Sequence, residues 1–375
     1  MVAASLARLR PIARWETGLV LLAACVLIFG TSTSPEFVSS RNFFYMSLNV
    51  GEVAIMTLPM ALIVISGEID LSVASTLGMS SALLGFLWIR GWPMPAVLVA
   101  VLAAGALAGL FNAVLITRFG LPSLAVTIGT LTLYRGVALI LLGPNSVSSF
   151  PVAYTNVGIL PFPGTDIPYS VVIFLVLAVL VGITLHATPV GRAIFAIGLN
   201  KEAAAFSGIR VRRIKTVLYV VSGVLSALAG ILFTFRLATA ISNNGTGLEL
   251  DVVAVVLFAG VSIFGGTGTI VGLVLAIFTF AAMQNALLLA NFNERAAGIV
   301  TGSLLLASVL VPTAVSYLSR LRRGLNGPTG VSAAEQPMAE PRASASEQPR
   351  AGLESATARD RPVWRANQPG TANGG

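Results

Sequence analysis

The sequence predicts an all-α, polytopic membrane protein with about ten transmembrane helices. Hydrophobic residues make up 55% of the 375 residues and charged residues only 10%, which is too little polar surface for a soluble chain of this length. The apolar residues are grouped in runs, and a helix needs about 20 of them to cross roughly 30 Å of hydrocarbon. Composition and run length together therefore favour membrane-spanning helices.

Ten apolar runs define the predicted helices. They cover residues 18–32, 48–66, 71–89, 94–117, 123–142, 169–185, 216–235, 250–264, 270–289 and 297–311. We predict a transmembrane domain over residues 18–315, preceded by a cytoplasmic amino terminus over residues 1–17. Residues 324–375 are rich in Ala, Pro, Ser and Glu, a composition that cannot bury enough apolar surface to fold, and they should form a disordered cytoplasmic tail.

The charges in the loops predict the orientation of these helices. Arg118, residues 192–215 and Arg320 fall on one side, whereas the loop 143–168 on the other side has no Lys or Arg. Because positively charged loops stay in the cytoplasm, both termini should be cytoplasmic. The same loops account for the formal charge of +8, so the lipid bilayer is an expected partner and nucleic acid is not.

One polar segment, residues 188–215, stands out between two long apolar runs. Within it Asn200 is a favourable helix N-cap, Glu202 suits the positive end of the helix dipole, and Gly208 favours a left-handed ending. These signals predict a helix of about two turns, which is too short to be stable alone. Two interpretations remain open: a basic loop that only fixes topology, or a helix that docks on a partner.

A second polar segment, residues 66–72, places Glu68 and Asp70 between adjoining apolar runs. Acidic groups there need water, backbone donors or a cation. Asp70 is expected to cap the following helix, with a role in a substrate pathway as the alternative. The order Glu-Ile-Asp-Leu at residue 68 returns as Glu-Leu-Asp-Val at residue 249, five runs later, which would suit inverted five-helix repeats.

Several other polar residues lie inside the apolar runs and are candidates for a substrate pathway. Arg135 is the most costly in hydrocarbon, so it should face a partner or a wet cavity, with an ion pair to a helix end as the alternative. The hydroxyl and amide groups could equally serve helix packing. The full set is Asp70, Ser72, Asn112, Thr127, Thr130, Arg135, Asp251, Gln284 and Asn285.

The residues needed for catalysis or nucleotide hydrolysis are missing from the sequence. One cysteine and one histidine exclude a disulfide framework and a zinc cluster built on cysteines, and there is no Gly-x-x-x-x-Gly-Lys-Ser/Thr phosphate loop. No cofactor or metal is therefore expected in this chain. A membrane-embedded enzyme is also disfavoured, because no group of polar residues has catalytic spacing.

Four motifs together resemble the permease subunits of carbohydrate ATP-binding cassette importers, the group that takes up ribose, rhamnose and autoinducer-2. They are G-R-A-I-F-A-I-G-L-N-K-E-A-A-A-F-S-G-I at residues 191–209, E-I-D-L-S-V-A at 68–74, T-I-G-T-L-T-L-Y-R-G at 127–136 and the glycine-rich stretch 258–272. The resemblance covers about residues 15–312. The second motif has Glu68 and Ala74 where glycine is usual and looks nearest to the rhamnose-type branch.

This resemblance implies that the chain moves a monosaccharide across a bacterial inner membrane and makes no bond. The substrate would be a rhamnose-like deoxyhexose, ribose or an autoinducer-2-like molecule. The implied partners are a cytoplasmic ATP-binding subunit that uses ATP and magnesium, a periplasmic sugar-binding protein, and a second permease in a homodimer or heterodimer. Coupling to the ATPase would involve Gly191, Arg192, Gly198, Asn200, Ala203, Ala204, Gly208 and Ile209. The alternative is a single-polypeptide transporter driven by a proton or sodium gradient.

Overall fold

The computed structural model describes residues 2–293, 298–299, 302–303, 306 and 310, and the predicted all-helical class is confirmed there. Two isolated β-bridges, Val147 with Ala240 and Pro161 with Pro168, are the only extended pairings among these residues. The elements are α1 (Val2–Thr33), η1 (Pro35–Val38), α2 (Ser40–Ile65), α3 (Val73–Ile89), α4 (Met94–Thr117), α5 (Ser123–Leu142), α6 (Val152–Ile159), α7 (Tyr169–Ala187), α8 (Pro189–Leu199), α9 (Lys201–Phe206), α10 (Val211–Leu237), α11 (Leu248–Phe258) and α12 (Ile270–Leu289).

Seven of the predicted runs appear as helices long and apolar enough to cross a membrane: α1, α2, α4, α5, α7, α10 and α12. Helix α1 begins at Val2, so the predicted separate segment 1–17 is continuous with the first span. Helix α10 begins at Val211 rather than at residue 216. The tenth run and the tail 324–375 lie largely or wholly outside the described residues.

Two of the predicted runs are shorter in the structure than in the sequence-based prediction. Helix α3 has 17 residues because residues 66–72 form a turn before it. The predicted span 250–264 was wrong in length, because α11 has 11 residues and ends at Phe258. Gly260 and Gly265 follow with φ of 83° and 82°, a left-handed backbone that glycine adopts readily and that turns the chain.

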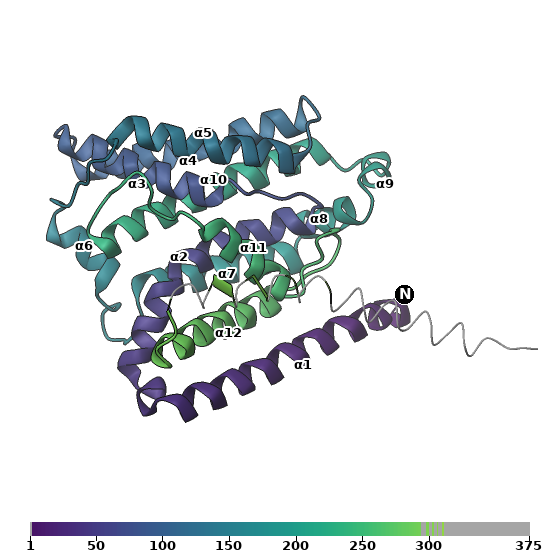
Figure 1. The fold of residues 1–375 in the computed structure, drawn as a ribbon. Coiled ribbons are helices and arrows are strands. Elements are labelled where there is room, and N and C mark those ends of the chain that lie inside the picture. The colour runs from purple at the N-terminus through teal and green to yellow at the C-terminus, as the bar shows by residue number, and fades with distance from the viewer. Residues whose placement is uncertain (1, 294–297, 300–301, 304–305, 307–309, 311–375) are drawn as a thin grey trace, which may run out of the picture. The chain divides into compact units, whose positions relative to one another are not determined.

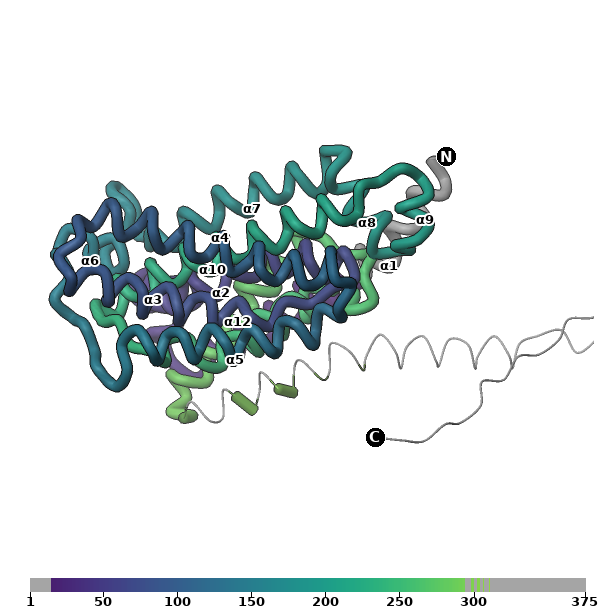
Figure 2. Tube along the Cα trace, turned by 90° about the horizontal axis from the view of Figure 1, so that it is seen from above, coloured from purple at the N-terminus to yellow at the C-terminus, as the bar shows by residue number. Residues whose placement is uncertain are grey.

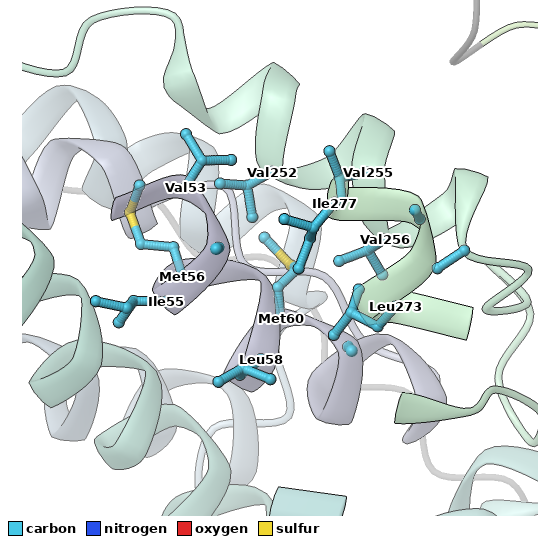
Figure 3. Close-up of a cluster of buried hydrophobic side chains, with 14 of the residues drawn as sticks. Val53, Ile55, Met56, Leu58, Met60, Val252, Val255, Val256, Leu273 and Ile277 are labelled. Carbon is cyan, nitrogen blue, oxygen red and sulfur yellow. The ribbon is translucent and has the colours of Figure 1, made fainter. Parts of the chain in front are cut away.

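Helices α2 and α10 lie at the centre of the described part of the chain (Figures 1 and 2). Helix α2 packs against α7, α10, α11 and α12, and α10 packs against α2, α3, α4 and α6. Figure 3 shows how apolar side chains of α2, α11 and α12 interdigitate, among them Met60, Val256 and Leu273. Ile55, Met56 and Leu58 are fully buried, so α2 is a core element and not a lipid-facing one.

Glycines allow α4 and α10 to cross closely. Gly109 of α4 lies so near the Tyr219 carbonyl oxygen that a Cβ could not fit, and the same holds for Gly105 and Gly223 against each other's backbones. Gly105 and Gly109 are four residues apart, the small-xxx-small spacing that favours close packing of membrane helices. The sequence contains this signal, although the sequence-based prediction did not use it.

Candidate functional site

The short helix predicted in the polar segment is α9, at the end of the helical bundle opposite α6 (Figures 1 and 2). Asn200 is its N-cap, and the Asn200 side chain accepts a hydrogen bond from the Ala203 N–H at 2.9 Å. Gly208 follows the helix with φ of 82°, so both predicted ends are confirmed. The cap contributes about 1 kcal/mol, which cannot by itself stabilise a six-residue helix.

Packing against α8 and α10 holds α9 in place. Ala204 is buried in a small apolar cluster with Ile197 of α8 and Val211 of α10. Ala203 is exposed, Ile209 is half-buried, and Phe206 is 92% exposed. Of these side chains, Phe206 is therefore the one that is free to contact a partner, whereas Ala204 is already covered by α8 and α10.

Helix α8 precedes α9 in a part of the polar segment where no helix was predicted. The Thr188 hydroxyl caps it by accepting from the Gly191 N–H at 3.4 Å, and Pro189 occupies the first turn. Gly191 is buried with no room for a Cβ beside the Leu185 carbonyl oxygen, whereas Arg192 is exposed. A Thr-Pro pair at a helix start is a recognisable signal in the sequence, and it was missed.

The backbones of three segments meet where α8 ends. Gly198 lies against the Ile65 carbonyl oxygen at the end of α2 and against the Gly266 N–H, leaving no space for a Cβ. Gly266 in turn donates from its N–H to the Ile65 carbonyl oxygen at 2.8 Å. We call Ile65, Gly67, Gly198, Gly265 and Gly266 the glycine junction. Through it, a displacement of α8 and α9 would reach the central helix α2 and the turn between α11 and α12.

Glu68 lies beside this junction and is paired. Its carboxylate pairs with the Lys215 ammonium on α10, and the two side chains are 14% and 5% exposed. The left-handed residue of this turn is Gly67, with φ of 79°, so Glu68 does not need the backbone freedom of glycine. The buried pair ties the α2–α3 turn to α10.

Asp70 belongs to a buried hydrogen-bond network and does not cap α3 as expected. One carboxylate oxygen accepts from the Ser72 N–H at 3.0 Å and hydroxyl at 2.6 Å, and the other accepts from the Ser222 hydroxyl at 2.8 Å. Asn112 donates to the Ser72 oxygen at 2.8 Å. Asp70, Ser72 and Asn112 are each at most 2% exposed, so these predicted pathway residues are brought together in a cluster that joins α3, α4 and α10.

The threonines of α5 lie at the edge of this network. The Thr127 hydroxyl donates to the Ile69 carbonyl oxygen at 3.4 Å, and Tyr219 of α10 donates to the same oxygen at 3.3 Å. Thr130 donates within its own helix, to the Thr127 carbonyl oxygen at 3.4 Å. Both threonines are buried, and their contacts are those of helix packing.

Arg135 contacts the backbone of the segment that connects α10 to α11. Its Nη1 donates to the Asn244 carbonyl oxygen at 2.6 Å, so this contact is with a backbone carbonyl and not the ion pair considered as the alternative. Gly78 of α3 makes room, because a Cβ there would collide with the guanidinium and with that same oxygen. The Asn244 amide donates to the Ser81 hydroxyl at 2.8 Å, which anchors the segment between α10 and α11.

Near the segment between α10 and α11, two atoms of charged side chains are buried without a hydrogen-bond partner among the described residues: Arg135 Nη2 and Glu249 Oε2. Glu249 lies in the first turn of α11 and is the carboxylate whose charge acts on Arg135. Asp251 is half-buried in the same turn. A buried polar atom without a partner costs roughly 1–3 kcal/mol, and more when charged. Ionisable residues buried inside a membrane protein commonly mark a substrate or ion pathway.

An ion pair that sequence reasoning missed joins the middle of α2 to the last turn of α10. Arg236 Nε donates to Glu52 Oε1 at 2.8 Å, and Glu52 is 1% exposed. Arg236 Nη1 also donates to Asn49 Oδ1 at 3.2 Å. Glu52 lies in an apolar run, and nothing near it in the sequence indicates that its partner is Arg236, 184 residues away.

The amides predicted in α12 have different surroundings. Asn285 and Asn42 of α2 exchange two hydrogen bonds, at 2.8 and 3.0 Å between amide nitrogen and oxygen. Gln284 is half-buried. For Asn285, the structure therefore favours a contact between neighbouring helices.

Replacing Asn285 with alanine should cost stability and little transport. Hydrogen bonds between membrane helices contribute about 0.6 kcal/mol on average and about 1.7 at most, so we expect a small drop in melting temperature in detergent. Uptake should stay within about twofold of the unmodified protein, as for substitutions outside a functional site. Gln284→Ala is the matched control. A loss of transport with unchanged melting temperature would instead place Asn285 in the pathway.

Comparisons with known proteins show what the whole chain is similar to. Residues 42–309 match the family described as "Branched-chain amino acid transport system / permease component". The autoinducer 2 import system permease proteins LsrD of Escherichia coli (strain SMS-3-5 / SECEC) and of Shigella flexneri are each 31% identical over 302 residues, which is 79% of this chain and 91% of each relative. No solved structure matches the chain significantly.

Proposed function

The chain belongs to this family of transport-system permease components, and we propose that it imports a small polyhydroxylated molecule, of the autoinducer-2 or monosaccharide kind, powered by a separate ATP-hydrolysing subunit. Its resemblance to permease subunits of ATP-binding cassette importers is thereby confirmed, and it is a multi-pass membrane protein. The relatives' name supports an autoinducer-2-like substrate over rhamnose or ribose. The family description names branched-chain amino acids, whereas the two relatives are named for autoinducer 2.

The observation that supports this mechanism best is that α9 packs on α8, whose last turn forms part of the glycine junction. Phe206 is exposed on α9, while Ala204 fixes α9 to α8 and α10. Gly198, in the last turn of α8, contacts α2 and the α11–α12 turn through its backbone, and these contacts leave no room for a Cβ. A partner that pushes α9 would move these elements together, because closely packed backbones transmit displacement.

In the proposed assembly, the positive-inside rule sets the orientation of this chain, and separate subunits hydrolyse ATP and deliver the substrate. The α9 end, with Arg210, Arg212 and Arg213, would face the cytoplasm, and both termini would lie there. ATP and magnesium would bind the partner ATPase, and a periplasmic binding protein would deliver the substrate at the opposite end. A second permease, identical or different, would complete the pathway.

Transport by the purified chain alone should stay at background level. In proteoliposomes that contain only this chain, a proton or sodium gradient should drive no uptake of labelled autoinducer-2 or sugar. Adding the ATPase, the binding protein and ATP should restore it. Substantial gradient-driven uptake by the chain alone would establish the secondary-transporter alternative and overturn the proposal.

A further inference from the structure

A basic pocket lies beside α9, separate from the buried networks described above. Its volume is about 620 Å³, and it is lined by the end of α4, the loop after it, α9 and the start of α10. Six cationic side chains line it: Arg118, Lys201, Arg210, Arg212, Arg213 and Lys215. Glu68 is the only acidic lining residue, and it already pairs with Lys215.

Five of these cations have no ion-pair partner in the part of the chain that the structure describes, where the two ion pairs are Lys215 with Glu68 and Arg236 with Glu52. Like charges gathered around one concave surface repel each other and raise its positive potential. The start of α10 adds the positive end of a 27-residue helix. The unpaired cations and the amino-terminal end of α10 would therefore both favour a bound anion.

The walls of the pocket also contain apolar residues. Ile116 and Phe119 line it at the end of α4, and Phe119 is 66% exposed. Leu121, two residues further, is 45% exposed. These residues lie where α4 leaves the predicted membrane, so cations and apolar surface meet at the level of the lipid headgroups.

The pocket is distinct from the docking face of α9. Lys201 and Ala205 line it, and residues four apart lie on the same face of a helix. Glu202 and Phe206 share another face, and Phe206 is not among the lining residues. A ligand in the pocket would thus contact α9, α10 and the α4–α5 loop without covering Phe206.

We propose that this pocket binds a phosphate-bearing group, namely the headgroup of an anionic phospholipid in the leaflet at the α9 end. The headgroup phosphate would contact the guanidinium groups, which match phosphate oxygens in pairs, and the acyl chains would lie along Ile116 and Phe119. The volume of the pocket exceeds that of a single phosphate ion, which favours a lipid over free phosphate. Bound there, the lipid would brace the elements that hold α9.

The test compares lipid binding by matched variants of the full-length chain. Purified protein in neutral detergent would be titrated with fluorescent phosphatidylglycerol and with phosphatidylcholine. We expect clear preference for phosphatidylglycerol and a loss of about thirtyfold in affinity in the double variant Arg118→Gln/Arg213→Gln, since two basic residues at about 1 kcal/mol each near an anionic surface amount to about 2 kcal/mol. Arg118→Lys/Arg213→Lys should retain most of the binding and verifies that the fold is intact.

The control is the double variant Arg41→Gln/Arg90→Gln, which removes two cations at the opposite end, where Arg41 and Arg90 stack on Tyr45 and Phe86. It should bind as the unmodified protein does. Competition with glycerol 3-phosphate distinguishes the source: no displacement identifies the lipid, and displacement with saturable binding identifies a soluble phosphate compound. Equal binding of both lipids, equal binding by all variants, or loss of ATPase association without loss of lipid binding would overturn the proposal.

Discussion

Replacing Phe206 with aspartate should abolish association with the ATP-hydrolysing subunit while the permease still folds and inserts. Phe206 is 92% exposed at the end of α9 and makes no aromatic contact within the described residues, so its removal leaves no cavity in this chain. Buried aromatic anchors at protein interfaces contribute about 2 kcal/mol or more, which corresponds to a loss of about thirtyfold in affinity. An aspartate would add the cost of desolvating a charge.

The measurement is co-purification of the ATPase subunit together with ATP turnover stimulated by loaded binding protein. Phe264→Asp is the matched control, because Phe264 is 85% exposed in the turn between α11 and α12 and not on α9. It should keep the association. Gly208→Val should weaken the association more mildly, since a β-branched residue at φ of 82° strains the end of α9 by roughly 1–2 kcal/mol. If Phe206→Asp co-purifies fully and stimulates fully, α9 does not dock on the ATPase.

Ala204 would have been a poor choice for this test, although the sequence motif includes it among the coupling residues. The sequence places Ala203, Ala204 and Ala205 in one run, and nothing local distinguishes their faces. In the structure Ala204 alone of the three is buried, against Ile197 and Val211. An aspartate there would detach α9 from the bundle, so loss of coupling would not identify a docking surface.

Signals from neighbouring residues in the sequence correctly predicted those helix ends and lengths that depend on neighbouring residues. Asn200 and Gly208 fixed the ends of α9 because capping depends on neighbouring residues. The lengths of α4, α5 and α12 followed from apolar runs bounded by polar or proline residues. The break after Phe258 was missed, because an apolar run continues through Gly260 and hydropathy does not register a change in backbone conformation.

The environment of the polar residues could not be predicted, because their partners are distant in sequence. Asp70 was expected to cap α3, yet one of its oxygens accepts from Ser222, 152 residues away. Asn285 pairs with Asn42 across 243 residues. Sequence reasoning therefore selected polar residues that are buried or half-buried, but it could not separate those that hold helices together from those with unsatisfied groups.

Arg135 is the predicted pathway residue with such an unsatisfied group, and replacing it with leucine should reduce transport by about thirtyfold. The substitution removes the donor to the Asn244 carbonyl oxygen and the positive charge on which the Glu249 carboxylate acts. Leaving the buried Asn244 carbonyl oxygen without this donor costs roughly 1–3 kcal/mol, and about 2 kcal/mol corresponds to about thirtyfold. Arg41→Leu, at an exposed position, should stay within about twofold.

A double-mutant cycle separates a role in the pathway from a role in packing. If Arg135 and Glu249 act mainly on each other, Arg135→Gln/Glu249→Gln should be less damaging than the sum of the single variants, by about 0.5–3 kcal/mol of coupling. If both also contact the substrate through Nη2 and Oε2, whose hydrogen bonds are unmade, the double variant should regain its melting temperature but not its uptake. Normal uptake by the double variant at normal abundance in the membrane would remove Arg135 and Glu249 from the substrate pathway.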